Sequence, residues 1–92
     1  MTEKERLLIN LDNLNSIEPG WDGSTGEIPD ERTIRTAKDL ISLFNEETLK
    51  IIAVFPGNQG GIYIQGRTAE IRISIYVIGT SITSSLKKNE LH

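Results

Sequence analysis

Polar and aromatic side chains alternate with isoleucine and valine along residues 62–65 and 69–78 of this 92-residue chain. Successive side chains of an extended strand point to opposite faces, so one face would be apolar and the other would carry the polar set. Tyrosine and arginine are enriched at interface hot spots, and aromatic rings on an open sheet can stack on bases. The pattern therefore predicts noncovalent binding of another macromolecule. The candidate residues are Tyr63, Gln65, Arg67, Arg72 and Tyr76.

A second candidate is the stretch at residues 18–30, which holds the only tryptophan of the chain among three glycines, two prolines and four acids. Trp21 can cover the edge of the core between two helices, with Asp22 capping a turn. The same pair can instead contact a partner. Both interpretations stay open, and we include Trp21 and Asp22 among the candidate partner-binding residues.

Covalent catalysis is not predicted. The chain has no cysteine, and its one histidine is the terminal His92, so no serine has an interior imidazole that could take its proton. The pattern Asp22-x-Ser24-x-Gly26 begins like a calcium-binding loop, but Glu27 stands where that loop needs glycine. We expect no enzymatic activity, no cofactor and no metal.

Length and charge narrow the class of protein. A chain of 92 residues predicts one domain with a modest core. Residues 1–48 carry eleven acids and five bases and residues 49–92 carry two and five, so the halves have net charges of −6 and +3. No apolar run is long enough to span a membrane, and the charged residues 1–6 are unlike a signal peptide. We expect a cytoplasmic protein.

Two helices are predicted in the first half. Residues 2–15 begin with Thr2 and Glu5 at capping-box spacing and place leucines on one face. Residues 30–44 begin with Asp30 as N-cap, and their apolar residues again form one stripe. Residues 45–47 are expected to end this second helix.

The periodicity then changes to that of strands. Residues 49–54 form an apolar run typical of a buried strand, residues 62–65 and 69–78 alternate, and 81–86 predict a weaker fourth strand. Hairpin loops are expected at 66–68 and 79–80, and a positive-φ turn or bulge at 60–61. The predicted fold is α+β, with two N-terminal helices packed on one face of a three- to four-stranded antiparallel β-meander. Residues 1–86 would be the domain, and 87–92 a flexible tail.

Several short motifs carry a resemblance: Gly-Trp-Asp-Gly at 20–23, Ile-Pro at 28–29, Val-Phe-Pro at 54–56 and Gly-Gly-Ile-Tyr-Ile at 60–64. Together they resemble a diffuse, largely uncharacterised family of small bacterial and phage proteins that is common near mobile elements. The resemblance implies a fold and a genomic setting but no reaction. Relatives tend to carry an acid followed by tryptophan where this chain has Gln65 and Gly66, so no role of that pair is carried over.

These observations favour a small non-catalytic protein-binding module. The resemblance adds a phage or mobile-element setting. Our hypothesis is that the protein inhibits or regulates a host defence or toxin component, in the manner of an anti-CRISPR protein or an antitoxin. The alternative is single-stranded nucleic-acid binding through the open sheet face. A homodimer through a strand edge is also left open.

Overall fold

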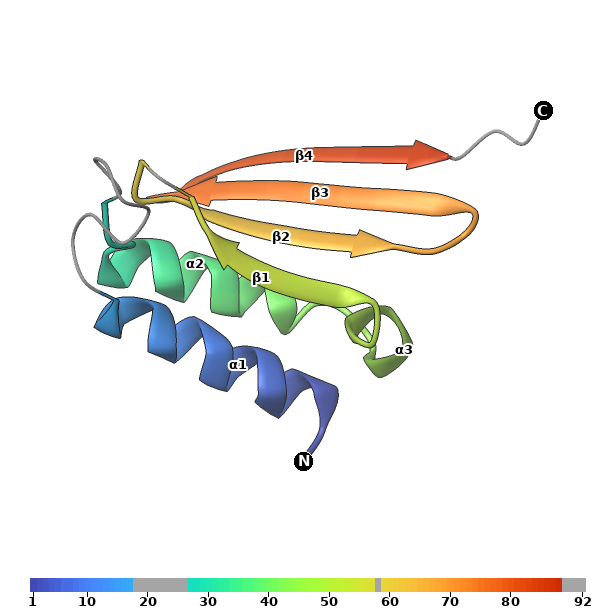
Figure 1. Ribbon diagram of the computed structural model, residues 1–92, viewed down its shortest axis with the longest axis horizontal. Coiled ribbons are helices and arrows are strands. Elements are labelled where there is room, and N and C mark those ends of the chain that lie inside the picture. Colours follow the sequence, from blue (N-terminus) through green and yellow to red (C-terminus); the bar gives the residue numbers. More distant parts are fainter. Residues whose placement is uncertain (18–26, 58, 89–92) are drawn as a thin grey trace.

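The computed structural model describes residues 1–17, 27–57 and 59–88. Over these residues the fold is α+β, with three α-helices followed by a four-stranded antiparallel sheet (Figure 1). The predicted class and the antiparallel meander are therefore confirmed. The helices lie on one side of the sheet, and we call the opposite side the outer face (Figure 1).

The first helix, α1, spans Glu3–Asn13 and continues into a 3-10 turn at Leu14–Ser16. Thr2 is its N-cap, because the Thr2 hydroxyl accepts a 3.1 Å hydrogen bond from the backbone N–H of Glu5. The guanidinium of Arg6 donates to the carbonyls of Leu49 and Ile52, and this fixes α1 against the segment that leads into the sheet.

The second helix, α2, spans Glu31–Ile41 and is capped by Asp30 as predicted. A carboxylate oxygen of Asp30 accepts a 2.8 Å hydrogen bond from the backbone N–H of Thr33. This bond, followed by the side-chain bond to Thr33, holds the pKa of Asp30 below its ordinary value. The helix buries its apolar stripe, including Ile34, Ala37 and Ile41.

A third helix corrects the prediction for residues 45–54. Asn45 does not end α2 but caps a short helix, α3, at Glu46–Leu49, and its side-chain oxygen accepts from the N–H of Thr48. The first strand, β1, therefore begins at Ile52 and not at Leu49. An apolar run of six residues does not distinguish a strand from a buried helical turn, and here Leu49 belongs to the helix.

The sheet has the strand order β1-β2-β3-β4, with each neighbouring pair antiparallel. Two boundaries differ from the prediction. Gly66 and Arg67 belong to a strand, and the hairpin loop lies at residues 68–70, where the Thr68 hydroxyl accepts from the N–H groups of Glu70 and Ile71. The last strand also extends beyond residue 86 into the expected tail. The strands are β1 Ile52–Pro56, β2 Ile62–Arg67, β3 Ile71–Ile78 and β4 Ser81–Lys88.

One apolar core joins the helices to the sheet. Helix α2 contacts β2 and β3, while α1 contacts α2, α3 and β1. Helix α2 also fixes the β3–β4 turn, because the buried Thr33 hydroxyl accepts from the N–H of Gly79 and the Thr36 hydroxyl donates to the Gly79 carbonyl, both at 2.8 Å. In contrast, every side chain of β4 is exposed.

Candidate binding face of the sheet

The strand register brings five of the seven predicted site residues together on the outer face. Tyr63 lies opposite Tyr76, Arg67 lies opposite Arg72, and Gln65 lies between Tyr63 and Arg67 on β2. All are exposed except Tyr76, which is half-buried. Trp21 and Asp22 fall outside the described residues, so their role stays a prediction.

Sequence reasoning missed two further residues of this face. Lys87 on β4 lies opposite Arg72, and Phe55 on β1 lies opposite Tyr63. The sequence predicts a tail at Lys87, because residues 81–88 lack a clear apolar alternation. Phe55 comes directly after the apolar run 49–54, which predicts a buried strand. The alternation of side chains along a strand could have placed Lys87 on this face, since it is separated by an even number of residues from Ser81 and by two from Ser85.

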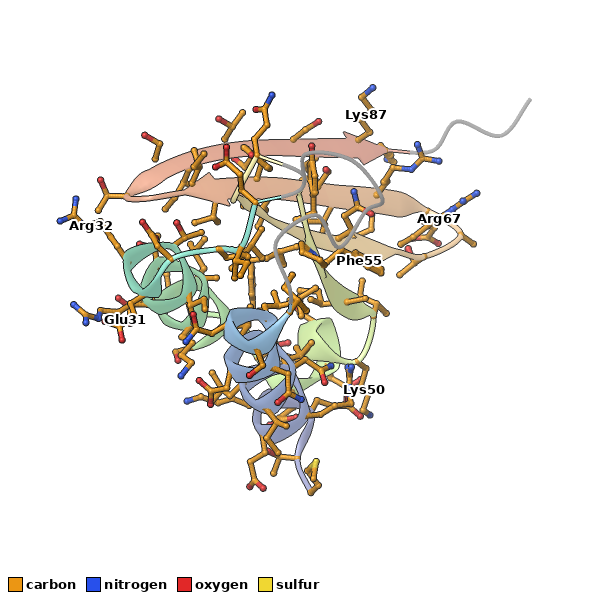
Figure 2. All side chains as sticks on the ribbon, turned by 60° about the vertical axis from the view of Figure 1, so that its left-hand side comes forward. Glu31, Arg32, Lys50, Phe55, Arg67 and Lys87 are labelled. Carbon is orange, nitrogen blue, oxygen red and sulfur yellow. The ribbon has the colours of Figure 1, made fainter. Side chains whose placement is uncertain are left out.

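Residues that lie opposite one another on neighbouring strands form rows across the outer face. The first row consists of Arg67, Arg72 and Lys87, and we call it the cationic row. It spans about 10 Å over three strands. In Figure 2 its members Arg67 and Lys87 extend from the sheet into solvent. A polar row and then an aromatic row follow. The rows are Arg67, Arg72 and Lys87; Ala53, Gln65, Ser74 and Ser85; and Phe55, Tyr63 and Tyr76.

The cationic and polar rows line a shallow, open groove of about 730 Å³. Phe55 of the aromatic row also lines it. None of the lining residues is acidic. The remaining lining is contributed by Ile51, Gly66 and Ile73.

The positive charge of the cationic row is not neutralised within the parts of the chain that the structure describes. The ion pairs found there all lie within residues 3–50, and none includes a residue of the sheet. Three cations on adjacent strands therefore face solvent without a carboxylate partner, and a negatively charged ligand could supply one. The pairs are Arg6–Glu3, Lys38–Asp12 and Lys50–Glu47.

The aromatic row rests on glycines of the β1–β2 connection. The rings of Tyr63 and Tyr76 have centroids 4.7 Å apart and planes tilted by 46°. A Cβ at Gly57 would lie 3.1 Å from the Tyr63 ring, and one at Gly61 would lie 2.3 Å from Cζ and Oη of Tyr76. Gly60 takes the predicted positive φ, 81°. These glycines therefore let the tyrosines lie close to the backbone.

The two tyrosines differ in what they offer a ligand. Burial raises the pKa of Tyr76 above its ordinary value, and the neighbouring Tyr63 and Glu27 act in the same direction. Tyr76 therefore stays a neutral phenol at physiological pH. Tyr63 and Phe55 are more open, with 39 % and 48 % of their surfaces exposed, and they present the ring surface that a partner can cover.

Within its described residues, 1–17 and 27–48, the acidic half of the chain forms no comparable site. Of the loop acids, Asp30 serves as the helix cap, and Glu27 forms an isolated bridge with Gln59. A smaller hollow of about 290 Å³ on the helices is lined by both acids and bases. Within residues 1–17, 27–57 and 59–88, no three histidine, cysteine, aspartate or glutamate side chains gather as a metal site would require.

Comparison of the chain with protein-family models, curated proteins and solved structures found no match. Among the described residues, no helix has the length and hydropathy needed to cross a membrane.

Proposed function

We propose that this protein is a non-catalytic binding protein, and that the outer face of its sheet holds the acidic surface of a protein partner. One observation carries the proposal: Arg67, Arg72 and Lys87 lie in direct register on adjacent strands, without carboxylate partners among the described residues. The exposed rings of Phe55 and Tyr63 lie on the same face.

The two kinds of row would contribute differently to such a complex. The cationic row would steer an acidic partner and fix its orientation, which mainly affects the association rate and the specificity. Buried aromatic anchors usually supply most of the affinity, and Phe55 and Tyr63 have the exposed surface to act in this way. The polar row between them offers Gln65, Ser74 and Ser85 for hydrogen bonds.

The proposal extends to a role in the cell through the resemblance described above. We propose that the protein acts in the cytoplasm as a stoichiometric inhibitor or regulator of a host defence or toxin component. The −6 charge of residues 1–48 supports a second contact, in which this acidic half of the chain occupies a site that normally receives nucleic acid.

A charge-reversal comparison tests the protein-binding proposal. Immobilised wild-type protein, Arg67→Glu/Arg72→Glu and Lys4→Glu/Arg35→Glu are incubated with host lysate, and each captured protein is then purified and titrated. The two doubles make the same change in net charge, but only the first alters the outer face. We expect one partner to bind the wild type and the helix variant and to lose at least tenfold in affinity for the sheet variant. Equal binding to all three proteins would refute the proposed face.

Single-stranded nucleic acid is the second candidate, favoured by exposed rings on neighbouring strands beside a row of cations. Bases would stack on Phe55 and Tyr63, at about 1–3 kcal/mol per base, while the cations contact phosphates. Fluorescence anisotropy with oligonucleotides at low and moderate salt tests this candidate. Binding should weaken with salt and on Phe55→Ala/Tyr63→Ala, and flat curves at low salt would exclude it.

A further inference from the structure

The strand β4 forms an unpaired edge of the sheet. Among the residues that the structure describes it pairs only with β3, and all eight of its side chains are exposed. The opposite edge is shorter, since β1 has five residues and ends in Pro56, which cannot donate a backbone hydrogen bond. Natural edges are usually blunted by proline, charge or short length, yet residues 81–86 of β4 contain no proline and no charge.

The turn at Gly79 and Thr80 determines which backbone groups of β4 are free. Gly79 has φ of 58° and Thr80 has no positive φ, as in a two-residue hairpin of type II′. Such a loop is closed by a hydrogen-bonded pair, here Ile78 with Ser81, and bonded and non-bonded pairs alternate from there. The N–H and C=O groups of Ile82, Ser84 and Leu86 therefore point away from β3 and toward the open edge.

The sequence of β4 is complementary to itself about Ser84. We propose that a second copy of this chain pairs antiparallel with β4, on a twofold axis through Ser84 perpendicular to the sheet. Ile82 of each copy then lies opposite Leu86 of the other, and Ser84 lies opposite Ser84. These are the residues whose backbone groups are free, so one register satisfies the hydrogen bonds and covers Ile82 and Leu86, now 48 % and 71 % exposed.

Neighbouring registers lose these contacts. In this twofold pairing, residues opposite one another must lie on the same face of the sheet, so their residue numbers must add to an even number. The two nearest alternative registers therefore change that sum by two. Such shifts place Ile82 opposite Ser84 or opposite Lys88. In the proposed register Lys87 lies opposite Ser81, so no two lysines face one another. This complementarity favours a second copy over an unrelated strand as the occupant of the edge.

The resulting dimer would have one eight-stranded sheet with all helices on the same side. The outer faces of the two copies would join across β4, and their cationic rows would lie on one continuous surface. A partner that contacts both rows would bind more tightly than one that contacts a single copy.

Cysteine cross-linking tests the register directly, because the chain has no cysteine of its own. In the proposed dimer the two Cα atoms of residue 84 are about 5.5 Å apart, within the range that a disulfide spans. The two copies of residue 81 are about 20 Å apart along the strands. Under mild oxidation, Ser84→Cys should form a covalent dimer and Ser81→Cys should not. Equal cross-linking of both variants would refute the register.

Light scattering on a sizing column tests the association without covalent chemistry. We expect the wild type to elute as a concentration-dependent dimer. Ser84→Lys and Ser84→Glu should each weaken dimerisation several-fold, because each places like charges opposite one another, and an equimolar mixture should restore it. The exposed position of Ser84 leaves the monomer fold unchanged, as circular dichroism would verify. A wild type that stays monomeric at high concentration, or variants that dimerise as it does, would overturn the proposal.

Discussion

The ring of Tyr76 occupies the space that a side chain at residue 61 would need. A Cβ built on Gly61 would lie 2.3 Å from Cζ and Oη of Tyr76, closer than nonbonded atoms approach one another. Gly61 itself has no positive φ, so the glycine is required here by the ring above it and not by the backbone conformation. The glycine-rich connection thereby sets the position of the aromatic row.

Gly61→Ala should therefore displace Tyr76 and destabilise the protein by about 1–3 kcal/mol, the usual effect of overpacking. The measurement is the free energy of unfolding in urea. The matched control is the same substitution in a Tyr76→Ala background, where the methyl group no longer meets the ring. The loss should nearly vanish there, and an equal loss in both backgrounds would show that the clash does not determine the residue.

The hydrogen bond from Gly79 to Thr33 should be among the more costly ones to remove. Thr33 is only 1 % exposed, and its hydroxyl accepts from the Gly79 N–H at 2.8 Å. Thr33→Val keeps the shape but leaves that N–H without its acceptor, so we expect a loss of about 1–3 kcal/mol in urea unfolding. Thr36→Val, at the half-buried hydroxyl that donates to the Gly79 carbonyl, is the control and should cost less. A larger loss at Thr36 would contradict this account.

The parts of the fold that follow from local chemistry were predictable from sequence. Thr2 and Asp30 cap their helices because each presents an oxygen to a free N–H three residues on. The inward face of β2 follows from the alternation at Ile62 and Ile64, both fully buried. These signals lie within a few residues of one another, so no tertiary information is needed to read them.

The remaining features depend on contacts that are distant in sequence. Lys87 belongs to a strand only because β3 offers it Arg72 as a partner, and its own neighbours Leu86 and Lys88 are exposed. Leu49 ends a helix because Asn45 caps that turn and the core accepts the side chain. The cationic row became visible only with the register, since Arg67, Arg72 and Lys87 are not evenly spaced in the sequence.

The cap of α2 predicts a loss of stability in acid. The hydrogen bonds from Thr33 lower the pKa of Asp30 in the folded state below its ordinary value of 3.8. The unfolded chain then binds the proton more tightly, so the stabilisation is fully present above about pH 4 and is lost as the pH falls through the folded pKa. Urea midpoints measured from pH 6 to pH 2 should show this decline, and Asp30→Asn, which still caps but does not titrate, should show less of it. Parallel profiles for the two proteins would contradict the prediction.

Tyr76 predicts the opposite dependence at alkaline pH. Burial raises its folded pKa above 10.0, so the stabilisation is present below pH 10 and is lost as the pH rises through the folded value. The chain has two tyrosines, and Tyr63→Phe leaves Tyr76 as the only phenol. Its ultraviolet titration should have a midpoint above 10.0 in the folded variant and a lower midpoint in urea, because unfolding restores the hydration of the phenolate. Coincident midpoints would show that the ring is not shielded by the glycines beneath it.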